Sequence, residues 1–272
     1  LMLRILRSLL ITKMNISKNR LLRRLRFLVQ MACVFTIISA TAVLMLGVSV
    51  LSGFRARRFN SEVIARTCAS ILLWVLRVKL KVHQERPFPQ SQTVYISNHT
   101  SSLDVIVIIA LGLPRARYFM KGYVRKYIPV GVVAYLVGTF FTVPQEFPEK
   151  RKSIFRRAAS VLLRTGDSVF LTPEGKITLT GEVGPFNKGA FHLATTLGAP
   201  IVPIYIQIPP EVDPGDGFEV QAKGTVNVFV SDPISTANCT LEELERNRDR
   251  VHEFYIRLHE KLRPAQSEAS PV

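Results

Sequence analysis

Residues 95–108 read YISNHTSSLDVIVI, and the change of pattern inside this stretch decides the fold. An apolar run ends at Asn98-His99, a polar turn follows, and the chain becomes apolar again after Asp104. The first part is typical of a buried strand at 93–97, and the last part is typical of a helix at 102–111. A strand, a polar turn and a helix in this order are the repeating unit of α/β proteins.

The same alternation continues along the chain. The patterns predict further strands at 117–120, 140–143, 168–172, 201–208 and 224–231, and helices at 128–138, 150–165, 188–197 and 241–262. Pro200 and Pro203 interrupt the strand pattern near 201–208, which predicts an edge strand or a bulge there. We therefore expect an α/β domain at 81–263, with a mixed β-sheet flanked by helices, and a disordered tail at 264–272.

An uncharged run of 28 residues, at 27–54, precedes this domain. Roughly 20 apolar residues span a bilayer core, so the run is long enough for a membrane helix and too long for a signal peptide. A second apolar stretch at 63–80 carries Arg66 and Arg77, which favours an interfacial helix. We expect residues 1–80 to form a basic N-terminus and a membrane-embedded two-helix segment; a buried core helix is the alternative for 27–54.

Positive charge lies on both sides of the apolar run. The net charge is +16, and residues 1–26 carry eight basic and no acidic side chains, whereas residues 55–210 carry 21 basic and 8 acidic ones. A single crossing would place these basic flanks on opposite sides of a membrane, against the positive-inside rule. We therefore favour a hairpin over 27–80 that dips into one leaflet, with both flanks on anionic lipid head groups.

Composition also limits the class of partner. A basic chain suits membrane lipids, nucleic acid or an acidic carrier protein. Basic motifs interleaved with aromatic residues, as in RNA-binding proteins, are missing from the sequence, so we do not expect nucleic acid. Cys33, Cys68 and Cys239 are odd in number and far apart, which predicts neither a zinc site nor a disulfide framework, and a reducing compartment for the main domain.

His99 and Asp104 fit two explanations. A histidine at a strand end can act as a general base when a carboxylate in the next helical turn binds one ring nitrogen and fixes the tautomer. Ser101 and Asp104 also form a capping-box pattern, and the helix dipole favours an acid in the first turn. This stretch alone does not decide between catalysis and capping.

A second stretch, VFLTPEGKITLTGEVGPFNKGAF at 169–191, has several features of a binding loop. Pro173-Glu174-Gly175 follows a strand, and loops at the carboxyl ends of strands commonly build sites. Gly184 and Gly189 permit close approach of a ligand to the backbone, as does Gly181. Lys188 precedes a helix N-terminus, which is a natural seat for an anion. A turn-rich loop with one solvated lysine explains the stretch equally well.

The order of these motifs resembles the glycerolipid acyltransferase family, typified by 1-acylglycerol-3-phosphate acyltransferase. The resemblance covers about residues 92–210 and rests on His-x4-Asp, Pro-Glu-Gly, Phe-Asn-Lys-Gly-Ala-Phe and Ala-Pro-Ile-Val-Pro-Ile, in that order. It implies transfer of a fatty acyl group from acyl-CoA or acyl-carrier protein to a lysolipid hydroxyl, without a metal or a resident cofactor. It also implies a bacterial inner membrane, with the catalytic domain on the cytoplasmic face. The oligomeric state is not implied.

The resemblance also implies roles for individual residues. His99 is the general base and Asp104 its orienting partner, and backbone N–H groups of the same turn stabilise the oxyanion. No acyl-enzyme forms in this mechanism, so no Ser or Cys nucleophile is needed. The predicted contacts to the acceptor come from a wider set: Asn98, Lys121, Glu174, Gly175, Lys176, Lys188 and Gly189. A non-catalytic basic module on a membrane or on nucleic acid is the rival class; it accounts for the charge but not for the order of the motifs.

The chain departs from the family pattern at two places. Val143-Pro144 stands where Asp-Arg is usual, and Ile177 stands where the Arg of Pro-Glu-Gly-Thr-Arg-Ser is usual. Arginine suits phosphate because its planar fork binds two oxygens at once. Lys176, Lys121, Lys188 or Arg125 would have to supply charge instead. The acceptor is therefore either 1-acylglycerol-3-phosphate or a phosphate-free lysolipid such as lyso-ornithine lipid.

Overall fold

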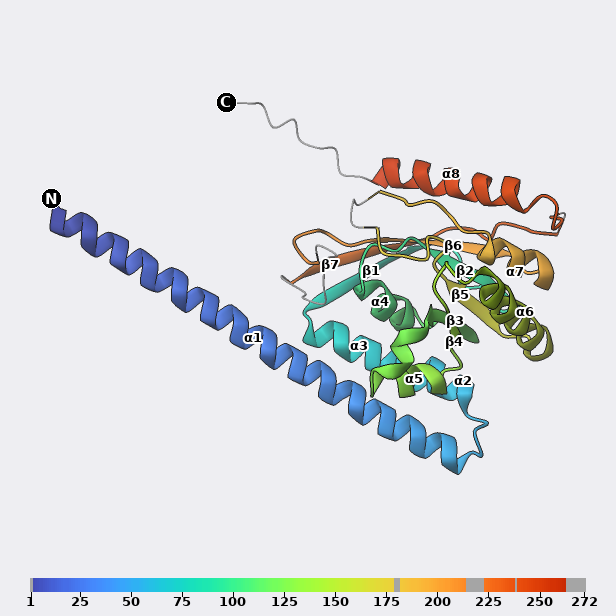
Figure 1. Ribbon diagram of the computed structural model, residues 1–272, viewed down its shortest axis with the longest axis horizontal. Helices are drawn as coiled ribbons and strands as arrows, with labels where there is room; N and C mark the ends of the chain where they lie inside the picture. Colours follow the sequence, from blue (N-terminus) through green and yellow to red (C-terminus); the bar gives the residue numbers. More distant parts are fainter. Residues whose placement is uncertain (1, 179–181, 214–222, 238, 263–272) are drawn as a thin grey trace.

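The computed structural model describes residues 2–178, 182–213, 223–237 and 239–262, with side chains from residue 25 onward. Within these residues the strands form one seven-stranded sheet in the order β1-β7-β6-β2-β5-β3-β4 (Figure 1). The strands are β1 (Val78–Gln84), β2 (Val94–Ser97), β3 (Ala116–Lys121), β4 (Phe140–Thr142), β5 (Ser168–Leu171), β6 (Ile201–Gln207) and β7 (Gly224–Val230). The disordered tail predicted at 264–272 lies outside the described residues.

The helices alternate with the central strands. They are α1 (Met2–Leu51), α2 (Arg57–Phe59), η1 (Asn60–Ala65), α3 (Arg66–Val75), α4 (Leu103–Leu111), η2 (Gly122–Lys126), α5 (Val130–Leu136), α6 (Pro148–Thr165), α7 (Gly189–Leu197) and α8 (Leu244–Leu262). Every neighbouring pair of strands is parallel except β6 and β7, which confirms the predicted mixed sheet. Because β2, β5, β3 and β4 are parallel, their carboxyl ends lie at one edge.

Two apolar cores cover the two faces of the sheet. On one face, α3, α4 and α5 contribute side chains such as Leu73, Ile108 and Leu136. On the other face, α6, α7 and α8 contribute side chains such as Leu162 and Phe191. Figure 1 shows α6, α7 and α8 on the side of the sheet away from α1, while α3 and α5 lie between the sheet and α1.

The prediction that β6 is an edge strand is wrong, because β6 lies between β2 and β7. The antiparallel ladder with β7 begins at the pair Ile204–Val230, so Pro203 lies one residue beyond it. The carbonyl of Pro203 accepts a hydrogen bond from the N–H of Ser231, and that of Pro200 accepts one from Val94. A proline is tolerated where the partner strand has ended and needs no donor.

The second apolar stretch, at 63–80, is not one interfacial helix. Helix α3 ends at Val75, and Arg77, with φ of 62°, turns the chain into β1, which pairs in parallel with β7. The domain boundary predicted at residue 80 thus falls inside a strand of the sheet. Helix α3 buries Leu72 and Leu73, although Trp74 is exposed. Helix α3, which falls in the predicted second membrane helix, therefore covers one face of the sheet of the α/β domain.

Among the described residues, only one helical segment, Leu25–Leu51 within α1, is long and apolar enough to cross a membrane. The structure thus confirms one apolar N-terminal helix rather than two. The C-terminal part of that segment packs against the domain, and Met45 is fully buried there in the same core cluster as Leu73.

A buried carboxylate ties the chain after α1 to the sheet. Asp167, 1% exposed, precedes β5 and receives the guanidinium groups of Arg57 (2.7 Å), Arg58 (3.2 Å) and Arg117 (2.9 Å). Burial acts to raise the pKa of Asp167, but Arg57, the Thr165 hydroxyl and Arg117 outweigh burial, and the pKa is lowered. Asp167 therefore stays ionised and links α2, β3 and β5.

Candidate active site

His99 and Asp104 meet at the carboxyl end of β2. The Nδ1 atom of His99 lies 3.1 Å from Oδ2 of Asp104, and the two side chains are 16% and 2% exposed. Because the same Oδ2 accepts hydrogen bonds from backbone N–H groups, it is an acceptor toward the ring, and Nδ1 carries the proton. The neutral imidazole then presents the lone pair of Nε2, for which the described residues supply no hydrogen-bond partner.

Asp104 both caps α4 and orients His99. Its Oδ2 accepts the N–H groups of Thr100 at 2.8 Å and Ser101 at 3.0 Å, in addition to the contact with His99. The hydroxyl of Ser101 accepts the N–H of Leu103 at 2.9 Å and completes the cap. The two explanations of the sequence are therefore compatible, because the cap fixes the carboxylate at the position that the imidazole requires.

Glu174 fixes the backbone of His99 instead of facing solvent. One carboxylate oxygen accepts the His99 N–H at 3.0 Å, and the other accepts the Thr178 hydroxyl and the Gly184 N–H. Burial raises the pKa of Glu174, although its hydrogen bonds with Thr178, His99 and Gly184 act in the opposite direction. The predicted contact of Glu174 with the acceptor gains no geometric support, since both oxygens are engaged within the protein.

The loop after β5 wraps around the same histidine. The N–H of Thr178 donates to the carbonyl of His99 at 2.8 Å, so both backbone groups of His99 are held. Gly175 adopts φ of +70°, where glycine is favoured, and its place in the turn brings Glu174 under His99. A Cβ at Gly184 would lie 2.8 Å from the carboxylate of Glu174, so only glycine fits there. The sequence predicted Gly184 only as a point of close approach for a ligand and gave Thr178 no role, because the roles of both residues depend on contacts across the loop.

Asn98 also positions the site. Its amide donates to the carbonyl of Ile206 at 2.9 Å and accepts the N–H of the same residue at 2.8 Å. Both polar groups of this buried side chain thus extend the ladder between β2 and β6. The predicted contact of Asn98 with substrate is not supported by this geometry, and we assign it to holding the end of β2.

The stretch from Asn187 to Gly189 serves packing and loop closure. Lys188 forms an ion pair with Glu245 of α8, so its charge is directed toward that helix. A Cβ at Gly189 would lie 2.7 Å from the ring of Phe155, which explains the glycine by close packing of α7 on α6. The amide of Asn187 donates to the carbonyls of Pro173 and Glu174. The anion seat predicted at Lys188 and Gly189 is therefore not supported.

The predicted cations Lys121 and Lys176 lie at the carboxyl edge and are exposed. Lys121 is paired in register with Thr142, which places it beside the Val143-Pro144 departure. Arg151 of α6, which the sequence did not single out among its basic neighbours, donates from Nη1 to the carbonyl of Val143 at 3.1 Å. A guanidinium is thus present next to the position where the family motif carries its arginine.

The predicted oxyanion contact gains no support from four of the N–H groups in this turn. The N–H groups of His99, Thr100, Ser101 and Leu103 all donate to protein acceptors, so they are not free to stabilise an oxyanion. These N–H groups are engaged because the carboxylates of Asp104 and Glu174 and the hydroxyl of Ser101 accept their hydrogen bonds.

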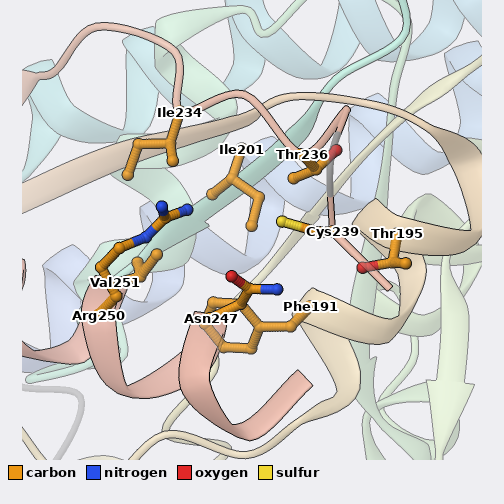
Figure 2. Close-up of a pocket in the computed structure, with 9 residues that line it drawn as sticks. All are labelled: Phe191, Thr195, Ile201, Ile234, Thr236, Cys239, Asn247, Arg250 and Val251. Atoms are coloured by element: carbon orange, nitrogen blue, oxygen red, sulfur yellow. The ribbon is translucent and has the colours of Figure 1, made fainter. Parts of the chain in front are cut away.

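A small pocket lies near the amino end of β6, beside α7 and α8 (Figure 2). Its lining includes Phe191 of α7, Ile201 of β6 and Val251 of α8, together with Ile234. Ile201 pairs with Val94 at the start of β2, whereas His99 follows the end of β2. None of the predicted site residues lines this pocket, so it is not part of the candidate active site.

The sequence is similar to those of known proteins. A family model described as Acyltransferase matches residues 79–207. The chain is 31% identical over 183 residues to a chloroplastic 1-acyl-sn-glycerol-3-phosphate acyltransferase of Brassica napus, covering 66% of this chain and 52% of that protein. It is 28% identical over 192 residues to the human beta form, covering 67% and 68% of the two chains.

The fold is also known from a crystal structure. That structure is the 1-acyl-sn-glycerophosphate acyltransferase from Thermotoga maritima, with a TM-score of 0.69, 20% identity, and coverage of 90% of this chain and 100% of that one. The chain spans about half the length of the Brassica relative, and 57% of an Arabidopsis thaliana one. Residues 79–207 therefore match the Acyltransferase family model, and the chain is similar in sequence to 1-acyl-sn-glycerol-3-phosphate acyltransferases.

Proposed function

We propose that the protein is a membrane-bound O-acyltransferase that transfers a fatty acyl group from a thioester to the free hydroxyl of 1-acylglycerol-3-phosphate, which yields phosphatidate. The observation that carries the proposal is the His99–Asp104 pair, with Nδ1 held at 3.1 Å and Nε2 left as a base at the carboxyl edge. Relatives named for this acceptor are similar to the domain in sequence, and a solved structure of an acyltransferase named for the same class of acceptor has a similar fold.

The chemistry follows from this geometry. Nε2 of His99 takes the proton of the acceptor hydroxyl while its oxygen attacks the thioester carbonyl. Asp104 stabilises the imidazolium that forms, because its carboxylate already accepts the Nδ1–H. When the tetrahedral intermediate collapses, the C–S bond breaks and the thiolate takes the proton from Nε2. The products are an ester and a free thiol, and no covalent enzyme intermediate is required.

We propose that the acceptor phosphate is bound by cations at the ends of β3 and β4, where Lys121 and Arg151 lie close to Val143. The segment beyond β4 is in contact with the catalytic loop, since Gln145 donates to Asn187, which in turn binds Glu174. The donor is acyl-CoA or acyl-carrier protein; both are anionic and suit the net charge of +16. The basic flanks of α1 favour the cytoplasmic leaflet.

The test uses the full chain in vesicles with a labelled acyl donor. His99→Ala should lower kcat by about 10²–10⁴-fold, the usual contribution of a general base. Co-flotation with the vesicles should stay unchanged, which distinguishes an enzyme from a basic membrane-binding module. His192→Ala, a half-buried histidine on α7, is the matched control. Unchanged transfer by His99→Ala would remove His99 as the base.

The acceptor is tested with a panel. Lysophosphatidate, lysophosphatidylcholine and lyso-ornithine lipid are offered separately, each with acyl-CoA or with acyl-carrier protein as the donor. We expect the highest kcat/KM with lysophosphatidate. A higher value with lyso-ornithine lipid would refute the proposed acceptor while leaving the acyl-transfer chemistry intact.

A further inference from the structure

The end of the candidate membrane helix is packed against the catalytic domain. Thr41, Ala42, Met45 and Ser49 of α1 are all buried, and α1 contacts α3 and α5 along this part. These residues belong to the only segment of sufficient length and apolarity among the described residues, Leu25–Leu51. The rise of 1.5 Å per residue makes the packed part, from Thr41 to Ser49, about 12 Å long. If the segment Leu25–Leu51 enters a bilayer, α3 and α5 lie beside the last third of this segment and therefore at the same depth in the membrane.

The surface next to this contact is apolar and aromatic. Tyr123, Tyr127, Ile128, Val130 and Tyr135 are exposed, with Ile128 at 76% and Tyr135 at 70%. They come from η2, α5 and the short connection between them, and we call them the η2–α5 surface. Arg125 and Lys126 are exposed between its members. Soluble proteins expose single large apolar side chains often, but five within 13 residues of the chain mark an interaction surface.

The composition of the η2–α5 surface fits a lipid interface. Tyrosines are enriched at membrane–water interfaces, because the ring is apolar and the hydroxyl is polar. Lys and Arg beside them are attracted to anionic head groups. The surface is also continuous with α1, since α5 packs on α1 directly (Figure 1). A protein partner would not require this continuity.

The η2–α5 surface also adjoins the active site. Strand β3 ends at Lys121, and η2 starts at the next residue, at the edge of the sheet that carries His99. A lipid acceptor held in the leaflet therefore reaches this edge without leaving the bilayer.

We propose that the η2–α5 surface is inserted in the head-group region of an anionic bilayer beside α1, and that it admits the acceptor to the active site from the leaflet. The proposal rests on the proposed function only in that α1 enters a membrane and the acceptor is a lipid.

Insertion is tested by tryptophan quenching. Trp74 is the single tryptophan, so Trp74→Phe provides a background without indole fluorescence. Ile128→Trp reports on the η2–α5 surface. Leu241→Trp is the matched control, because Leu241 is 55% exposed and lies three residues before α8, which is on the side of the sheet away from α1 (Figure 1). Phe35→Trp, 60% exposed on α1, reports on insertion of α1 itself. The proteins are reconstituted in phosphatidylcholine–phosphatidylglycerol vesicles with brominated acyl chains.

We expect strong quenching of Phe35→Trp and Ile128→Trp and at least several-fold weaker quenching of Leu241→Trp. Quenching of Phe35→Trp alone would overturn the docking of the η2–α5 surface while α1 remains a membrane helix. If neither is quenched, the membrane location of α1 is wrong, and the docking proposal is overturned with it. Acyl transfer is not measured in this experiment, so failure of the proposed function has no influence on it.

Admission of the acceptor is tested with the double variant Tyr127→Ser/Ile128→Ser. We expect its KM for a long-chain acceptor in vesicles to rise about tenfold, with kcat unchanged for a short-chain, water-soluble acceptor. An equal effect on both acceptors would contradict entry from the leaflet. If the double variant converts an oligomer in detergent into a monomer, while Ile128→Trp is not quenched, the surface binds a second copy of the chain and the proposal is wrong.

Discussion

The two halves of the carboxyl edge differ in how completely their polar groups are used. At the ends of β2 and β5, His99, Asp104 and Glu174 are held by backbone hydrogen bonds, and Asp104 and Glu174 are almost fully buried. At the ends of β3 and β4, Lys121 is exposed and Arg151 is anchored by one carbonyl. The first half resembles a preorganised catalytic centre, and the second resembles a binding surface whose cations adjust to a ligand.

Polar residues of a motif can therefore support catalysis without touching substrate. Glu174 and Asn98 carry the polar groups that sequence reasoning assigned to the acceptor, yet they bind the backbones of His99 and Ile206. We therefore expect substitutions at the β2–β5 half to reduce kcat, and substitutions at the β3–β4 half to raise KM.

The largest effect is expected for Asp104→Asn. The amide cannot stabilise the imidazolium as a carboxylate does, and its NH2 group would be left buried or would face the donors Thr100 and Ser101. We expect kcat to fall by about 10²–10⁴-fold, as when the orienting acid of a catalytic triad is replaced. A kcat within threefold of the unsubstituted protein would mean that Asp104 is only a cap.

Asp167→Asn should lower the stability of the fold without changing the catalytic rate. It leaves the partly buried guanidinium groups of Arg57 and Arg117 without their buried carboxylate, which costs about 3–5 kcal/mol of unfolding free energy. The pKa of Asp167 is lowered in the folded state, so its contribution is present above its ordinary pKa of 3.8 and is lost as the pH falls through the lowered value.

Thermal unfolding in detergent at several pH values checks this prediction. The difference in Tm between the two proteins should be constant above about pH 5 and should shrink below pH 3.8. At temperatures where both proteins are folded, kcat should be unchanged. A difference that grows on acidification would contradict the assignment of Asp167 as an ionised hub.

Gly189→Ala sharpens the reassignment of the loop before α7. The new methyl group meets the ring of Phe155 at 2.7 Å, and such overpacking costs about 1–3 kcal/mol. Phe155→Leu in the same chain should restore part of the stability, as measured by thermal unfolding. If Gly189 instead bound the acceptor, the single variant would raise KM and the second substitution would not relieve that effect.

The smallest effect is expected for Arg151→Ala at the β3–β4 half. Loss of one guanidinium from a phosphate site should raise KM for 1-acylglycerol-3-phosphate about tenfold, which is about 1.4 kcal/mol. Arg156→Ala, an exposed arginine on the same helix, is the control. Equal KM values for the two variants would show that α6 does not contribute to binding the acceptor.

Local patterns predicted the elements that position the site. The strand, turn and helix from β2 to α4 follow from periodicity and capping within about 20 residues. The strand and the helix lie close to their predicted positions. Strand β1 was not predicted because no Gly or Pro separates α3 from β1, and pairing with β7 shows where the strand begins.

The roles of single residues were harder to predict. Asn98 binds Ile206, 108 positions away, and Lys188 pairs with Glu245, 57 positions away. Spacing in a sequence carries no information on such distant partners. The roles of Asn98 and Lys188 could therefore be assigned only from the folded structure. The His99–Asp104 pair was predictable because both of its members lie in one turn.

The burial of Met45 in the core of the catalytic domain has a consequence for modularity. The anchor and the enzyme do not behave as two parts joined by a linker, because α1 completes one face of the core that α3 and α4 begin. The buried amide of Asn60 also donates to the hydroxyl of Ser49 on α1, at 2.8 Å. Removing the anchor to obtain a soluble enzyme would therefore open the core, and the domain acquires its final packing only once α1 is in place.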